Sequence, residues 1–196
     1  MQAALLEATL RTLKELGYAK TTTTEVVARA GVSQGALFRY YPTKEALLSA
    51  AATELCASLF PRFRAALRAK KNDTDPVEQA IRGLWRVFKT DEVRVLHELY
   101  AAAPNEPALK SALLPVLVAH RAQTLEVAKE LFPALARSPH FEVATDLVLA
   151  TMTGAALMTL GDSDKRREEA FIASLVGSTR VALAIVAGSP GAAPPW

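Results

Sequence analysis

The stretch TTTEVVARAGVSQGALFRYYPTK, which begins at Thr22, carries the densest set of helix signals in the chain. Thr22 followed by Glu25 forms a capping box, which starts a helix. Gly31 can adopt the left-handed conformation that ends this helix, and Ser33 can cap a second one. Pro42 disfavours helical geometry at the residue before it, so the second helix must be short. Two short helices joined by such a turn predict a helix-turn-helix.

The second of these helices is expected to read DNA in the major groove. Leu37 and Tyr41, four residues apart, share the face that packs on the first helix. Thr43 caps a third helix, where Lys44 and the helix N-terminus can together hold one phosphate. The outward face of the second helix combines a base-edge reader, two small residues and two groups that reach phosphates: Gln34, Gly35, Ala36, Arg39 and Tyr40.

The run AGVSQGALFRYYPTKEALL resembles the DNA-binding signature of the tetracycline-repressor (TetR) family of bacterial one-component regulators. The resemblance covers roughly Leu5 to Leu48, and beyond it extends only to length and helical layout. Phe38 stands where the family usually has Tyr, so its contact must be apolar, as with a thymine methyl. An ordinary helical hairpin is the alternative, but the offsets of the aromatic residues and of Pro42 disfavour it. With the cap Ser33 included, the DNA-binding residues implied are Thr23, Thr24, Ser33, Gln34, Gly35, Ala36, Phe38, Arg39, Tyr40 and Lys44.

The composition indicates a soluble, intracellular, globular protein, with 51% hydrophobic and 22% charged residues among 196. A net charge of only +3 means that affinity for DNA must come from a local patch and from two copies binding together. Cys56 is the only cysteine, which fits a reducing cytosol. Glu7 and Arg11 interrupt the first apolar stretch, so no secretory signal is expected. Later apolar stretches contain Glu142 and Asp146, so neither a membrane span nor a membrane partner is expected.

Apolar residues at helical spacing predict helices along the whole chain, so the expected fold is all-α with about nine helices. The first should end near Gly17, and the one that starts at Thr43 should reach about Phe60, where Pro61 breaks or kinks it. The expected organisation is a three-helix DNA-binding domain at 1–48, a helical ligand-binding and dimerisation domain at 49–188, and a disordered tail at 189–196.

Several of the later helices carry aromatic and polar residues that could line a mostly apolar cavity for a small molecule. The alternative is that the apolar members are core residues and the histidines lie at the surface. The residues of this candidate ligand site are Trp85, Phe88, His97, Tyr100, His120, Gln123 and Met152.

The last two helices are apolar around most of their circumference, which predicts burial on two sides. Gly154 would let a partner helix approach closely, and two helices from each of two subunits form the expected symmetric dimer. The alternative is burial inside one large monomer core. The candidate homodimer interface comprises Leu147, Gly154, Leu157, Met158, Leu175, Val176 and Leu183.

We therefore expect a ligand-responsive transcriptional regulator, a cytoplasmic repressor that binds double-stranded DNA at a palindromic operator and is released by a small apolar or amphipathic effector. A helical protein-binding adaptor and a small helical enzyme are the alternatives. The sequence has no phosphate-cradling glycine loop and no HExxH motif, and its three histidines lack metal-ligand spacing, so no enzyme, cofactor or metal site is expected. The basic segment Arg62–Lys71 is either a solvated helix face or an additional phosphate contact.

Overall fold

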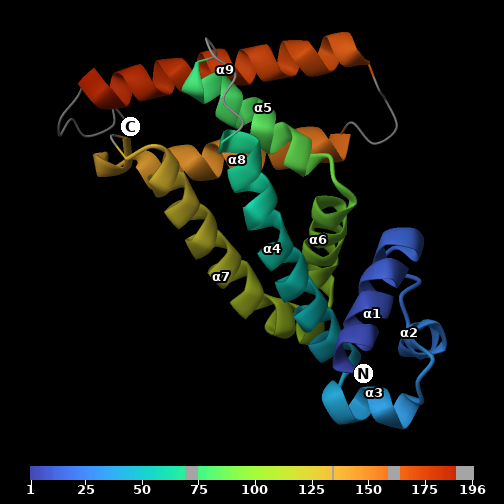
Figure 1. Ribbon diagram of the computed structural model, residues 1–196. Helices are drawn as coiled ribbons and strands as arrows, with labels where there is room; N and C mark the ends of the chain where they lie inside the picture. The colour runs from blue at the N-terminus through green and yellow to red at the C-terminus, as the bar shows by residue number, and fades with distance from the viewer. Residues whose placement is uncertain (69–74, 134, 159–163, 189–196) are drawn as a thin grey trace. The chain divides into compact units, whose positions relative to one another are not determined.

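The structure is a computed structural model that describes residues 1–68, 75–133, 135–158 and 164–188. Within these ranges the chain forms nine α-helices and two short 3₁₀ helices, with no strand (Figure 1). The all-α class is therefore confirmed for the described residues. The helices are α1 (Gln2–Leu16), α2 (Thr23–Ala30), α3 (Gln34–Tyr40), α4 (Lys44–Arg68), α5 (Pro76–Phe88), α6 (Asp91–Ala102), η1 (Ala103–Asn105), α7 (Pro107–Leu131), η2 (Leu135–Arg137), α8 (Phe141–Met158) and α9 (Lys165–Gly188).

The chain divides into two compact units whose boundary falls inside α4 and α7. Unit 1 combines Met1–Pro61 with Thr90–Arg121, and unit 2 combines Arg62–Lys89 with Ala122–Trp196. This is a division by packing. The functional domains at 1–48 and 49–188 are a division by role and stay a prediction, and the tail 189–196 lies outside the described residues.

The hydroxyl caps in unit 1 are those that the sequence predicts, whereas the Glu25 carboxylate, expected to complete the capping box, accepts from Arg29 Nε at 2.7 Å. The Thr22 hydroxyl accepts a hydrogen bond from the Glu25 amide at 3.2 Å, which starts α2. Gly31 ends α2 with φ at 67°, a conformation that an L side chain rarely adopts. The Ser33 hydroxyl accepts from the Ala36 amide at 3.2 Å and starts α3. Short-range hydrogen bonding thus sets the turn between these two helices.

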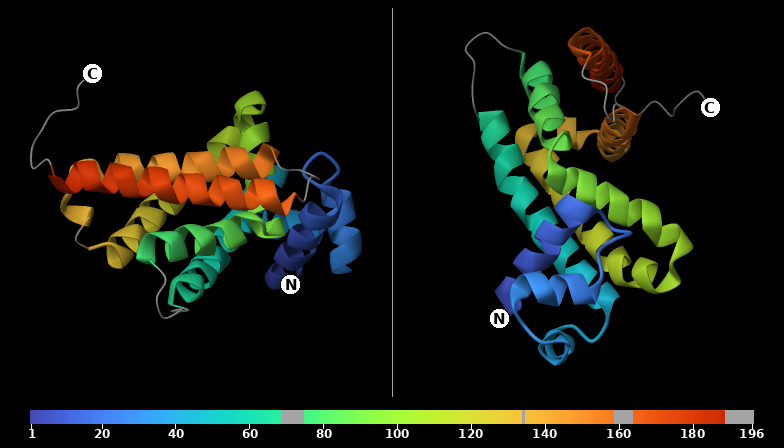
Figure 2. Two further views of the ribbon diagram at one scale, coloured as in Figure 1. Left: turned by 90° about the horizontal axis from the view of Figure 1, so that it is seen from above. Right: turned by 90° about the vertical axis from the view of Figure 1, so that its right-hand side faces the viewer.

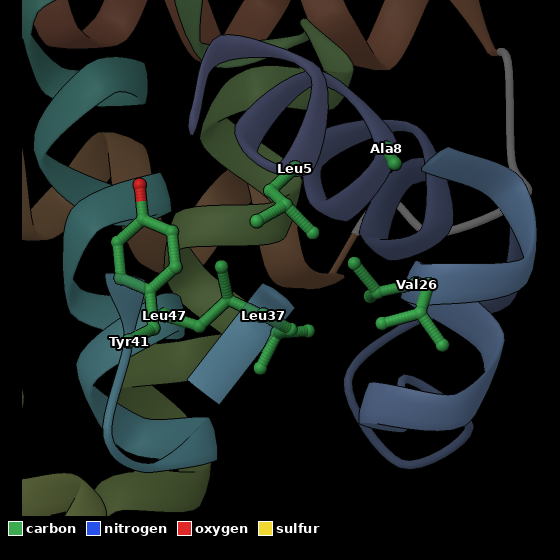
Figure 3. Packing of buried hydrophobic residues seen from close by; sticks show 7 residues of the cluster. Leu5, Ala8, Val26, Leu37, Tyr41 and Leu47 are labelled. Carbon is green, nitrogen blue, oxygen red and sulfur yellow. The ribbon is translucent and has the colours of Figure 1, made fainter. Parts of the chain in front are cut away.

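The small core of α1, α2, α3 and the start of α4 is shown in Figure 3. Leu5 from α1, Val26 from α2 and Leu37 from α3 point into it, and Leu47 closes it from α4. Tyr41, just after α3, is buried in the same cluster, as its four-residue spacing from Leu37 predicts. α3 is therefore held by apolar packing on one side only, which leaves its other side to solvent.

α4 continues through Pro61 to Arg68, so the helix break expected near Phe60 does not occur. A proline inside a helix removes one backbone donor and crowds the preceding turn. Leu59 and Phe60 are buried in unit 1, and this packing holds the helical geometry up to the proline. Of the two outcomes expected at Pro61, a break or a kink, the break is therefore wrong, because the proline removes a single backbone donor and the residues on both sides keep helical geometry.

Unit 2 has a core formed by α5, α8 and α9, in which Trp85, Met152 and Ile172 are buried. Both views in Figure 2 show α8 and α9 running alongside each other. The Trp85 indole N–H donates to the Glu168 carboxylate at 2.9 Å, and Lys89 Nζ lies 2.6 Å from the same group. Polar contacts therefore fasten the start of α9 to α5 at the edge of an apolar core.

We expect acid to loosen α9 from α5. The hydrogen bond from Lys89 lowers the pKa of Glu168, and that from Arg180 lowers the pKa of Asp75. A carboxylate whose pKa is lower in the folded state stabilises the fold above its unfolded pKa, which is about 4, and this contribution disappears as the pH falls through the folded pKa. Denaturant unfolding between pH 6 and 3 should show a smaller loss in Glu168→Gln than in the wild type; equal losses would contradict the assignment.

Candidate nucleic-acid interface

The outward face of α3 is largely open to solvent, although Gln34 and Ala36 are half-buried. Leu37 is 0% exposed, whereas Phe38, the next residue, is 46% exposed. Gly35, Arg39 and Tyr40 are exposed as well. The structure therefore presents together the small, aromatic and cationic groups that the sequence predicts for contact with DNA.

Gln34 is held in place by α2. Its side-chain nitrogen donates a hydrogen bond to the Thr24 hydroxyl at 3.2 Å, and its side-chain oxygen is buried without a hydrogen-bond partner among the described residues. A side-chain amide has two N–H donors, so one remains for an acceptor on a base edge. Two residues predicted separately as DNA contacts, Thr24 and Gln34, thus form one joined group in the free protein.

Lys44 opens α4, where the Thr43 hydroxyl accepts from the Ala46 amide at 3.1 Å. Its ammonium nitrogen lies 4.8 Å from the centre of the Tyr18 ring, a cation–π distance. The negative face of the Tyr18 ring attracts the ammonium and restricts its position, and the ammonium keeps its positive charge. Lys44 is therefore positioned at a helix N-terminus, as a phosphate contact requires.

Tyr18 itself is fixed by carboxylates far away in the sequence. Its backbone N–H donates to Glu98 Oε1 at 2.6 Å, and its hydroxyl donates to Glu106. Burial, followed by the hydrogen bond and the negative charge of Glu106, raises the pKa of the Tyr18 hydroxyl. Gly17 before it has φ at 77°, and a Cβ there would lie 2.7 Å from Glu98 Oε1, so a side chain at this position would be strained and would displace the Glu98 carboxylate. Sequence reasoning missed Tyr18 because nothing local marks its partners.

α8 carries most of the predicted dimer interface on an open face. Leu147 is 63% and Met158 88% exposed, and Gly154 and Leu157 are exposed too. A Cβ added at Gly154 would meet nothing within 4 Å. In contrast, Leu175 and Val176 are buried in the core of unit 2, and the side chain of Leu183 lies outside the described residues.

Among the described residues, one helix, α8, is long and apolar enough to cross a membrane by length and composition alone, and 11% of it is buried. It also contains Glu142 and Asp146, and it packs against α5 and α9 within unit 2.

The predicted ligand-site residues are divided between the two units. In unit 1, His97, Tyr100 and His120 are half-buried. The His120 ring lies 5.3 Å from that of Phe60, and the Tyr100 hydroxyl lies 3.8 Å from the sulfur of Cys56. Burial lowers the pKa of both histidines, so both favour the neutral form. This differs from the alternative in which the histidines lie at the surface.

In unit 2, Trp85 and Met152 share the core and Phe88 packs against it, whereas Gln123 is exposed. A cavity of about 110 Å³ lies in the same unit, lined by α5, α7, α8, the end of α4, and single residues of η2 and α9. None of the seven predicted residues is among those that line it. Three phenylalanines, Phe63, Phe132 and Phe141, do line it, and periodicity alone could not separate them from ordinary core residues.

A sequence profile described as "Bacterial regulatory proteins, tetR family" matches residues 5–51. An uncharacterized HTH-type transcriptional regulator of Mycobacterium tuberculosis is 31% identical over 158 residues, which is 80% of each chain. The chain belongs to the TetR family. The HTH-type transcriptional regulator CymR of Pseudomonas putida is also similar, with 29% identity over 170 residues, 86% of this chain and 83% of the relative.

Solved structures of similar length share the fold over nearly the whole chain. A TetR-family transcriptional regulator from Rhodococcus sp. matches with a TM-score of 0.69 at 20% identity, covering 93% of this chain and 97% of that one. The multidrug binding protein EbrR, in complex with imidazole, matches with a TM-score of 0.65 at 23% identity, covering 98% and 96%. The family consists of transcriptional regulators rather than enzymes. The described residues hold no group of three or more His, Cys, Asp or Glu placed to bind a metal.

Proposed function

We propose that this TetR-family regulator is a cytoplasmic repressor that binds a palindromic operator as a homodimer and leaves it when a small effector binds. The observation that carries the proposal is the open face of α3, with Gln34 held by Thr24 and Lys44 held by Tyr18 at its edge. All ten predicted DNA contacts fall inside the residues 5–51 that match the family profile.

The homodimer would form through the exposed apolar face of α8, with α9 as its neighbour. Burying such a face is favourable in proportion to the apolar area removed from water. Two recognition helices one groove turn apart, about 34 Å, would then meet the two halves of the operator. In this scheme the domain at 1–48 binds DNA, and the domain at 49–188 forms the dimer and binds the effector.

The effector would act by preferring a form of the protein that cannot hold the operator. Its effect on DNA binding can be no larger than the difference between its affinities for the two forms. The structurally similar multidrug binding protein EbrR was solved in complex with imidazole. For this chain we propose a small apolar or amphipathic effector. The ligand site predicted from the sequence is the set of seven residues that includes Trp85 and Met152.

Fluorescence anisotropy tests the proposal by comparing binding to two duplexes, the DNA upstream of the gene that encodes this chain and a random sequence. Two variants are measured beside the wild type. Gln34→Ala should cost about 1–3 kcal/mol of operator binding and relax base preference at one position, because it removes a base-edge donor. Lys44→Ala should weaken all sequences alike and reduce the salt slope by about one, because it removes a phosphate contact.

The two variants serve as controls for each other. Identical behaviour would contradict the division of roles between base and phosphate. Equal binding of operator and random duplex by the wild type at physiological salt would reject specific DNA binding altogether, and would favour the adaptor alternative.

Tyr18 is expected to matter through its ring rather than its hydroxyl in the placing of Lys44. Tyr18→Phe keeps the ring face, whereas Tyr18→Leu removes it. Because a cation–π contact at an exposed site is worth about 0.5–1 kcal/mol, the leucine variant should bind DNA roughly two- to fivefold more weakly than the phenylalanine variant. The same salt series measures it, and equal affinities of the two variants would show that the ring does not position the ammonium.

A further inference from the structure

The cavity in unit 2 presents no charged side chain among its described lining residues. Apart from three threonines, every lining residue is aliphatic or aromatic. Several charged residues are adjacent in sequence to lining residues, and three of these are paired outside the lining: Arg64 with Glu130 at 3.3 Å, Arg82 with Glu78 at 2.9 Å, and Arg180 with Asp75 at 2.8 Å. A ligand with a buried charge would therefore find no partner for it there.

The threonines add little polarity. The Thr145 hydroxyl donates to the Phe141 carbonyl at 2.9 Å, and the Thr179 hydroxyl donates to the Leu175 carbonyl at 2.7 Å. Each of these bonds returns to the threonine's own helix and uses the only hydroxyl proton. Thr145 and Thr179 thus present methyl groups to the cavity together with hydroxyl groups whose protons are already hydrogen-bonded.

The volume sets an approximate size for the ligand. An apolar cavity of about 150 Å³ lined by Leu, Ile and Phe stays dry and binds benzene in another protein. The cavity here, at about 110 Å³, is of the same order and has a similar lining, but it is partly open to solvent. Burying an unpaired carboxylate or ammonium in such a site costs far more than its apolar contacts return.

We infer that this cavity binds a neutral, predominantly hydrocarbon molecule of about one six-membered ring, such as an alkylbenzene. The inference narrows the effector of the proposed function from apolar or amphipathic to uncharged and apolar, and its regulatory meaning rests on that function. It also moves the ligand site from the residues first predicted to the surface where α5, α7 and α8 face one another inside unit 2.

Fluorine NMR on the full chain without DNA tests the ligand class directly, with 4-fluorotoluene, 4-fluorobenzoate and 4-fluorobenzylammonium as probes of nearly one size. The neutral probe should bind saturably, and the two charged probes at least about tenfold more weakly, because each would bury an unpaired charge. Absence of saturable binding of 4-fluorotoluene, or equal binding of a charged probe, overturns the inference.

A matched pair of variants on α7 tests the place. Ala128 lines the cavity, whereas Ala122 on the same helix is exposed. Ala128→Leu should weaken binding of 4-fluorotoluene at least about fivefold by filling the space, and Ala122→Leu should leave it unchanged. If Ala128→Leu does not fold, Ala144→Val fills the same cavity from α8. Unchanged binding in the cavity-filling variant overturns the assignment.

Anisotropy with operator DNA then separates the two claims. Binding of 4-fluorotoluene with release of the operator supports both the ligand class and the effector role. Binding without release leaves the ligand class standing and contradicts release of the operator by this ligand. Failure of the neutral probe to bind, with operator binding intact, overturns the ligand class and leaves DNA recognition untouched.

Discussion

Leu37→Ala is expected to lower the free energy of unfolding by roughly 2–5 kcal/mol, because it opens a cavity in a small core that has little else to fill it. Leu37 is fully buried between α1, α2 and the start of α4. The same core fixes the orientation of α3. Specific operator binding should therefore be lost together with stability, as chemical denaturation and anisotropy on the same preparation would record.

Phe38→Ala is the control one residue away. Phe38 is largely exposed, so its truncation should change the free energy of unfolding by no more than about 1 kcal/mol while still weakening operator binding. A stable Leu37→Ala protein that binds the operator normally would contradict the role of this core. So would a Phe38→Ala protein that unfolds as readily as the Leu37 variant.

The double substitution Leu147→Glu and Met158→Glu is expected to convert a dimer into monomers. Both side chains stand on the open face of α8, where two carboxylates from each subunit would be brought together without partners. A monomer reaches only one half-site, so operator affinity should fall at least about 100-fold with the loss of two-site binding. Analytical ultracentrifugation at micromolar concentration measures the first effect, and anisotropy measures the second.

Val118→Glu supplies the comparison. Val118 lies on α7 in unit 1 and is 61% exposed, close to the value for Leu147, but it is outside the proposed interface. This variant should remain dimeric. A wild-type chain that sediments as a monomer would reject the homodimer, and a double variant that stays dimeric would place the interface elsewhere.

The helices and turns between Thr22 and Lys44 could be predicted almost residue by residue because their determinants are local. The Thr22 and Ser33 caps and the Gly31 turn act over three or four residues, so short spacings in the sequence carry their geometry. The exposed and buried faces of α3 follow from the same spacing. Interactions between residues three or four positions apart can be recognised in the sequence without knowledge of the tertiary structure.

The contacts that sequence reasoning missed are those between distant residues. Tyr18 meets Glu98 and Glu106 only because α1 packs against α6 within unit 1. The cavity of unit 2 is equally non-local, since aromatic residues that line it, such as Phe132, have the same pattern as those that fill a core. Pro61 shows the reverse case, in which a strong local signal for a helix end does not end α4.

The hydrogen bond between Gln34 and Thr24 has an evolutionary consequence. The two side chains share one donor and one acceptor across two helices. Substitution at position 34 alone removes the hydrogen bond that orients this side chain, whereas paired substitution at positions 24 and 34 can introduce a new base-contacting side chain that is already oriented. Related regulators that recognise different operators should therefore differ at these two positions together more often than at either one separately.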